Sequence, residues 1–255
     1  MGSIYLIRHG QASFDSADYD QLSDLGDLQS RQLGAWFKAR KVPIHGAFSG
    51  SMKRHQQTAQ AFGQQHGRLP EPVIHSGLNE YDHEAILTAF VGQFEDSDAF
   101  DRHMASSSNP KKAFQAIFEK AVARWVSGEH DSDYPESWTA FKSRVMAGLG
   151  HVVAHSLQLD TGDESASVVV FTSGGAIACI AQQLLNMPDA QAFHLNWSIT
   201  NCSVSKLLFN DRGHITLASF NEQAHFEGHI QGLLDEQAVG LEAWAPRRNE
   251  LLTYR

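Results

Sequence analysis

The residues best able to do chemistry follow an apolar run at the start of the chain. Residues 3–7 read Ser-Ile-Tyr-Leu-Ile, and Arg8, His9 and Gly10 come next. A guanidinium group matches the oxygens of a phosphate or carboxylate group, and an imidazole can act as nucleophile or general base. The motif therefore predicts an anion site beside a candidate nucleophile. An arginine and a histidine that only end a strand at the surface would give the same motif. Partner residues elsewhere in the chain are therefore needed to distinguish a site from a surface strand end.

A second arginine stands in a comparable place. The apolar stretch Gly46–Ser49 is followed by a turn and then by a predicted helix from Lys53 to about His66, with Arg54 in its first turn. The amino terminus of a helix adds partial positive charge to that of the arginine. Two arginines, each just beyond a strand end, indicate an anion site better than either one alone.

A carboxyl group follows the third predicted strand, Pro72–His75. Glu80 comes shortly after that strand and lies next to apolar Leu78 in the sequence. Burial favours the protonated form of a carboxyl group, which a general acid needs near neutral pH. Glu80 is therefore a candidate proton donor. The alternative is an acidic surface loop, because Asp82 and Glu84 are close by.

Hydroxyl and amide groups complete the candidate site. The β-branched run Ser167–Thr172 predicts a central parallel strand, and Ser173, Gly174 and Gly175 follow it before a helix that ends near Leu185. Free N–H groups at a helix amino terminus can bind an anion, so Ser173 and Gly174 are predicted to contact one. Ser13, in the polar loop after Gly10, is close enough in sequence to donate its hydroxyl.

The elements that must position these residues alternate between strands and helices, which predicts an α/β fold in one domain spanning residues 1–255. Residues 85 to about 134 have helical patterns and no strand pattern, so we expect a helical insertion over the carboxyl ends of the strands. Two strands around the turn at 210–213, Asn201–Phe209 and His214–Phe220, are predicted to form a hairpin. No structure is predicted from residue 226 onward.

Composition limits the possible partners and the location. The formal net charge of −9 argues against nucleic acid or an anionic membrane as partner. No run of 18 apolar residues occurs, and Cys179 and Cys202 have apolar neighbours like reduced core cysteines, so we expect a cytoplasmic protein. The histidine pair His151/His155 lies in a segment that predicts a solvated helix face, and His225/His229 has no HExxH context, so no metal site is predicted.

The order of these motifs resembles the histidine phosphatase superfamily, also called the phosphoglycerate-mutase-like family. The resemblance implies a three-layer α/β/α sandwich with a mostly parallel sheet. It covers nearly the whole chain and rests on Arg8–Gly10, Gln21–Gly26, Ser49–Arg54 with Thr58 and Ala59, Leu78–Glu80, Glu136 and Ser137 with Arg144, Val169–Gly175, Asn201–Val204 and Asn221–His225.

The resemblance also implies roles for the candidate residues. His9 would take the phosphoryl group of a small phosphorylated substrate as phosphohistidine. Arg8 and Arg54 would hold the phosphate oxygens, and Glu80 would protonate the leaving alcohol. Such a site uses no metal and no cofactor, because arginines and helix-end amides supply the positive potential. Neither the oligomeric state nor the particular substrate follows from the pattern.

Ser173 departs from the family pattern, which has a second histidine at this position. A serine hydroxyl cannot donate a charge-assisted hydrogen bond, which contributes roughly 1.5–3 kcal/mol against about 1 kcal/mol for a neutral one. His83 or His225 could replace the missing histidine in space, and Asp15 stands near where relatives have an asparagine. The alternatives are therefore a phosphatase, or a phospholigand-binding protein with little turnover. The residues after Glu80 disfavour a phosphoglycerate mutase.

Overall fold

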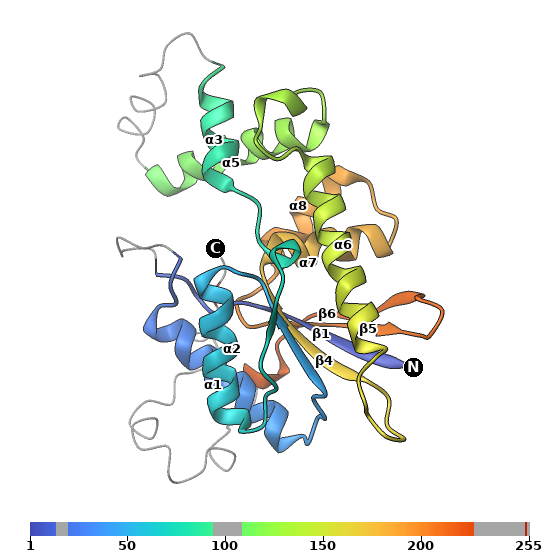
Figure 1. Ribbon diagram of the computed structural model, residues 1–255. Helices are drawn as coiled ribbons and strands as arrows, with labels where there is room; N and C mark the ends of the chain where they lie inside the picture. Colours follow the sequence, from blue (N-terminus) through green and yellow to red (C-terminus); the bar gives the residue numbers. More distant parts are fainter. Residues whose placement is uncertain (14–19, 94–108, 227–252, 254–255) are drawn as a thin grey trace.

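A computed structural model describes residues 1–13, 20–93, 109–226 and 253 (Figure 1). Across these residues, a six-stranded sheet runs in the order β3-β2-β4-β1-β5-β6. Its strands are β1 (Gly2–Arg8), β2 (Gly46–Ser49), β3 (Val73–Ile74), β4 (Ser167–Thr172), β5 (Val204–Phe209) and β6 (Ile215–Glu222).

Four neighbouring strands of this sheet are parallel. β1 and β2 both pair with β4 in parallel, and β3 pairs with β2 in parallel, whereas β5 is antiparallel to both β1 and β6. Arg8 lies opposite Thr172, and Ser49 lies opposite Phe171, which directly precedes Thr172. The carboxyl ends of β1, β2 and β4 therefore meet at one edge, where ligands bind in open α/β sheets.

Alternate residues of β4 enter two separate hydrophobic cores. Val168 and Val170 pack beneath α6 (Trp138–Ser156) and α7 (Gly174–Leu184). Val169 and Phe171 pack in the other core, beneath α1 (Asp24–Ala39) and α2 (Lys53–His66). Figure 1 shows these two pairs of helices on opposite faces of the sheet. The three-layer α/β/α sandwich with a mostly parallel sheet is thus confirmed.

Local signals set the bounds of the helices beside the site. The Ser23 side chain accepts a hydrogen bond from the Gly26 N–H and caps α1, and Asp24 complements the helix dipole. Helix α2 begins at Lys53 and ends at His66, as the sequence predicted, and is capped by Gly67, whose φ of 81° is in the left-handed region that favours glycine.

Helices also fill the described part of the predicted insertion. They are α3 (His83–Val91) and α5 (Pro110–Ser127), which lie side by side in Figure 1. Within residues 85–93 and 109–134, the structure contains no strand. On α5, the Trp125 ring lies 5.3 Å from the Tyr81 ring and 5.2 Å from the Trp138 ring, between centroids. The insertion thus shares a hydrophobic core with the sheet, next to Glu80.

Two elements differ from the prediction. Helix α8 (Asp189–Ser198) was not predicted; it follows the helix that was predicted to end near Leu185, and its partly buried Phe193, Leu195 and Trp197 pack on the core. The first hairpin strand begins at Val204, not at Asn201 as predicted, because the chain turns at residues 201–202 and Cys202 has a φ of 56°. The hairpin itself is confirmed.

The described residues also form three short 3₁₀ turns, which are η1 (Ser76–Leu78), η2 (Asp131–Asp133) and η3 (Ala224–Phe226). Both cysteines are free and buried, as expected. Among the residues described, no helix is long and apolar enough to cross a membrane.

Candidate active site

The candidate residues from different strands come together at the carboxyl edge of the sheet. The His9 N–H donates to the Thr172 carbonyl at 2.9 Å, which places His9 beside the end of β4. The Gly50 N–H donates to the Phe171 carbonyl at 3.0 Å, which holds the turn before α2 against the same strand. The turns after β1, β2 and β4 therefore face one another.

The His9 ring is held with one nitrogen available. Its Nδ1 lies 2.7 Å from the Gly10 carbonyl oxygen, and a carbonyl can only accept, so Nδ1 carries the hydrogen and Nε2 carries the lone pair. Burial, followed by the charges of Arg54, Arg8 and His55, lowers the pKa of His9 well below its usual value. A neutral imidazole with a lone pair at Nε2 has the electronic form of a nucleophile.

Backbone contacts fix the turn that carries His9. The Asn201 side-chain amide donates to the His9 carbonyl at 3.0 Å, and the Gly10 N–H donates to Thr58 Oγ1 at 3.0 Å. A Cβ atom on Gly10 would lie 2.3 Å from the Gly26 carbonyl oxygen, so this close approach requires glycine. The motifs at residues 26, 58 and 201 thus all support the position of His9.

Both candidate arginines are almost fully buried, at 3% and 5% exposure. Arg8 donates to the Ile199 carbonyl, and Arg54 Nη1 donates to Asp20 Oδ1 at 2.7 Å. The other oxygen of Asp20 accepts from the Lys53 N–H at 2.9 Å. The site is therefore a buried cationic spot in an acidic protein, with one carboxylate bound to it that the sequence did not single out.

Glu80 is buried at the amino terminus of α7, at 6% exposure. Its Oε2 accepts from the Gly175 N–H at 3.1 Å, and its Oε1 accepts from the Tyr81 N–H at 3.2 Å. A Cβ atom on Gly175 would lie 2.1 Å from Oε1, and one on Gly174 would lie 2.5 Å from Asn196 Oδ1. Gly175 therefore lets the Glu80 carboxylate approach the helix end. The acidic-surface-loop alternative for Glu80 does not fit this burial.

Arg144 fixes the turn that precedes Glu80. Its guanidinium group binds both oxygens of Glu136, at 2.7 and 2.8 Å, and donates to the carbonyls of Ser76 and Asn79 at 3.0 and 3.1 Å. The Glu136 carboxylate is thus the partner of Arg144. Because Arg144 also holds the backbone at Ser76 and at Asn79, it helps to position the turn that leads to Glu80.

The two serines lie in different surroundings. Ser13 is half-buried, and its N–H donates to the Gln21 carbonyl at 2.8 Å. Ser173 is fully buried, and its Oγ lies 2.6 Å from His55 Nε2. Asp15 lies outside the described residues.

His55 is a site residue that the sequence analysis missed. The sequence offers His83 and His225 as substitutes for a second histidine. His83 begins α3, and His225 is buried with its ring 6.2 Å from that of Trp36. The histidine that contacts Ser173 comes from α2 instead. The available signal was its position directly after Arg54, at the start of the helix that reaches the site.

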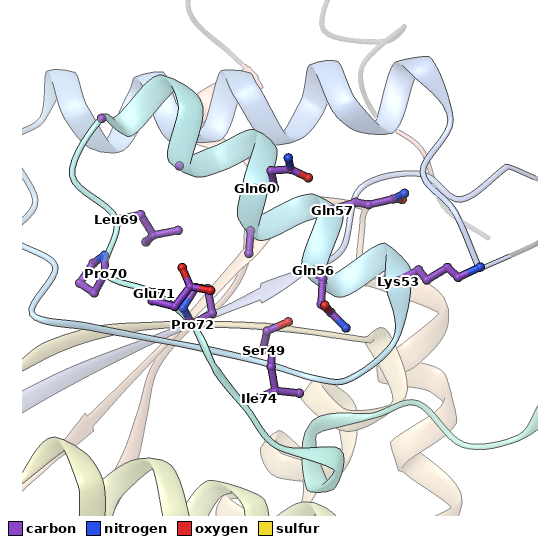
Figure 2. A pocket seen from close by; sticks show the side chains of 13 residues that line it. Ser49, Lys53, Gln56, Gln57, Gln60, Leu69, Pro70, Glu71, Pro72 and Ile74 are labelled. Carbon is purple, nitrogen blue, oxygen red and sulfur yellow. The ribbon is translucent and has the colours of Figure 1, made fainter.

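An open pocket of about 560 Å³ lies beside α2. Figure 2 shows Gln56 and Gln60 on one wall and Glu71 and Pro72 on the other. None of the four candidate catalytic residues lines it. In the described parts of the chain, no group of three or more histidine, cysteine and acidic residues could hold a metal ion.

These features define a class of protein: an α/β sandwich whose sheet edge holds a neutral histidine, two buried arginines and a buried carboxylate. The sequence matches the histidine phosphatase superfamily (branch 1) over residues 4–223. The chain therefore belongs to the histidine phosphatase superfamily. No curated protein matches it.

Solved structures share the fold at low sequence identity. A phosphoglycerate mutase from Bacillus anthracis str. Sterne is 17% identical with a TM-score of 0.57, and the match covers 88% of this chain and 94% of that one. A phosphoserine phosphatase mutant from Entamoeba histolytica, in complex with phosphoserine, is 19% identical with a TM-score of 0.57 and coverage of 88% and 99%. A mycobacterial glucosyl-3-phosphoglycerate phosphatase in complex with VO3 is 21% identical with a TM-score of 0.59 and coverage of 87% and 99%.

Proposed function

We propose that this protein hydrolyses small phosphomonoesters through a phosphohistidine on His9, without a metal ion or other cofactor. The observation that carries the proposal is the state of His9. Its Nδ1 is bound to the Gly10 carbonyl, and its lowered pKa keeps Nε2 unprotonated. A neutral imidazole next to the buried guanidinium groups of Arg8 and Arg54 suits attack on a phosphoryl group.

The reaction would proceed in two steps. First, His9 Nε2 bonds to phosphorus, the bond from phosphorus to the alcohol oxygen breaks, and Glu80 gives that oxygen a proton. Water then attacks the phosphohistidine, the phosphorus–nitrogen bond breaks, and the Glu80 carboxylate takes a proton from the water. Arg8 and Arg54 would offset the charge on the phosphoryl oxygens, and Ser13, Ser173 and the Gly174 amide would donate hydrogen bonds to them.

The substrate class follows from the chemistry of this site. Arginine pairs recognise the phosphoryl group alone, so the rest of the substrate must be selected elsewhere. We propose that the insertion, residues 85–134, makes this selection as part of the same domain, because Trp125 packs on Tyr81 beside Glu80. Among the structural relatives, one binds phosphoserine and another is named for a sugar phosphoglycerate, which supports a small phosphorylated metabolite.

A second candidate function is a phospholigand-binding protein with little turnover. The observation that favours it is Ser173, because a buried hydroxyl offers the phosphoryl group no positive charge. A phosphoglycerate mutase is the third candidate and has no specific observation in its favour beyond the shared fold.

The test is hydrolysis of p-nitrophenyl phosphate in the presence of a metal chelator. The parent, His9→Ala and the control His214→Ala would be compared, His214 being exposed in the hairpin turn. We expect turnover in the parent and the control and none in His9→Ala. Rapid quenching with labelled substrate should trap an acid-labile phosphoenzyme, as expected for a phosphorus–nitrogen bond.

The outcomes separate the candidate functions. Turnover by His9→Ala at the parent rate would rule out the phosphohistidine. A parent that binds inorganic phosphate through Arg54 but hydrolyses nothing would support the binding protein. Because His55 fills the space beside Ser173, gain of activity by Ser173→His should be sought together with His55→Ala.

A further inference from the structure

His55 is buried in the candidate site but has no part in the reaction proposed above. Its side chain is fully buried, and its ring centroid lies 5.7 Å from that of His9. Its Nε2 lies 2.6 Å from Ser173 Oγ. His9 and Ser173 are themselves neighbours, because the parallel register of β1 and β4 pairs the residues just before them, Arg8 with Thr172. The two rings and the hydroxyl therefore form one cluster.

The surroundings of His55 are built to admit an imidazole. A Cβ atom on Gly50 would lie 2.2 Å from His55 Nδ1, so only glycine at that position leaves room for the ring. Nδ1 is buried and has no hydrogen-bond partner in the described part of the chain. Burying a polar ring with a single polar contact costs free energy that an apolar side chain would avoid. A purely structural role therefore explains this residue poorly.

We propose that His55 is a positioning residue that turns the Ser173 hydroxyl toward the phosphoryl group at His9. The inference rests on the proposed function, because it names how that site holds its phosphate. If the His55 hydrogen is on Nε2, the ring donates to Ser173 Oγ, and the Ser173 O–H remains free to donate to a phosphoryl oxygen. If the hydrogen is on Nδ1, Ser173 must donate to His55 and turns its lone pairs toward the anion.

Electrostatics supports a neutral imidazole for this role. Burial first, and then the positive charge of Arg54, lowers the pKa of His55 well below its usual value. A neutral ring carries a single hydrogen, so its position decides which way the hydroxyl donates. A bound phosphate selects the form with the hydrogen on Nε2, because the other form would set oxygen lone pairs against the anion.

The test is a double-mutant cycle on the binding of inorganic phosphate, measured by calorimetry, with kcat/KM measured alongside. Ser173→Ala and His55→Leu should each weaken phosphate binding about five- to tenfold, the equivalent of one neutral hydrogen bond. The double variant should bind no more weakly than Ser173→Ala. His55→Gln should restore most of the affinity, since its amide can donate to Ser173. The control is His66→Leu, on the same helix outside the site.

Additive losses in the double variant would overturn the proposal, and so would parent-like phosphate binding by Ser173→Ala. Ser173→Ala removes a single oxygen atom, so this arm remains decisive if His55→Leu fails to fold in a thermal melt. If the parent protein binds phosphate but does not hydrolyse esters, only the proposed function is overturned, because the double-mutant cycle measures the affinity for phosphate. A parent that binds no phosphate overturns both.

Discussion

Replacing Glu80 with glutamine should slow hydrolysis by an amount that depends on the leaving group. A general acid contributes about 10²- to 10⁴-fold where the leaving oxygen needs a proton. An alkoxide needs that proton, whereas nitrophenolate leaves readily without it. We therefore expect kcat/KM, which reports the leaving-group step alone, to fall about 10²-fold or more for an alkyl phosphate and less than about tenfold for p-nitrophenyl phosphate.

The same substitution has a cost in stability that the structure sets. Both oxygens of Glu80 accept backbone hydrogen bonds, from Gly175 and Tyr81. A glutamine amide has one accepting oxygen, so its NH₂ group must face one of these two N–H groups. A buried N–H without an acceptor lowers the free energy of unfolding by about 1–3 kcal/mol. The variant should remain folded but melt earlier than the parent.

The assay compares steady-state rates on p-nitrophenyl phosphate and glycerol 3-phosphate. Glu84→Gln is the matched control, because Glu84 is an exposed carboxylate only four residues away. It should match the parent on both substrates. Equal losses of kcat/KM on both substrates in Glu80→Gln would refute proton donation by Glu80 to the leaving group, because the later attack of water does not enter kcat/KM.

Three further changes test the surroundings of the site. Arg144→Lys should lower kcat/KM on alkyl phosphates about 10²-fold and that on nitrophenyl phosphate less, because the turn before Glu80 would lose its bidentate anchor. Steady-state kinetics on both substrates measures this. Asp20→Asn should tighten competitive inhibition by inorganic phosphate about two- to fivefold, because Asp20 competes for the Arg54 guanidinium group. Burial lowers the pKa of His225 to about 3. Below pH 6.5 the unfolded chain therefore binds a proton that the native chain excludes, and the free energy of unfolding decreases as the pH decreases. At pH 5 this lowers the free energy of unfolding by about 2 kcal/mol relative to neutral pH. His225→Gln should remove that loss, which urea unfolding at pH 5 and pH 7 measures.

Much of the fold could be predicted because its signals are local. The β-branched run of β4 and the cap at Ser23 depend on neighbouring residues and on burial, which the sequence displays directly. Helix α8 carries a weaker signal: it is short, and of its residues only Ala192 and Asn196 are buried. The start of β5 was misjudged because Cys202 looks like a strand residue but takes a left-handed conformation.

The candidate site could be predicted only in part, for a related reason. A motif shows which groups follow a strand end, and the carboxyl ends of parallel strands meet at one edge of the sheet. Arg8, His9 and Arg54 could therefore be predicted to lie close together. No local sequence pattern predicts the contacts that side chains make with one another across that edge. The N–H groups at the start of α7 were predicted to bind an anion through Ser173 and Gly174, and the structure shows that the next amide, that of Gly175, binds the carboxylate of Glu80.

Gly50 and Gly175 show why such contacts escape a sequence analysis. Gly50 directly follows β2 and Gly175 lies in the first turn of α7, and neither has the positive φ by which a backbone role of glycine is usually explained. Each glycine matters because it has no Cβ atom. A Cβ atom would lie 2.2 Å from His55 Nδ1 at position 50, and 2.1 Å from Glu80 Oε1 at position 175. The two side chains admitted in this way converge on α7, because Ser173 directly precedes this helix and Gly175 lies in its first turn. The residue types at the helix start therefore determine how a hydroxyl and a carboxylate are arranged around His9.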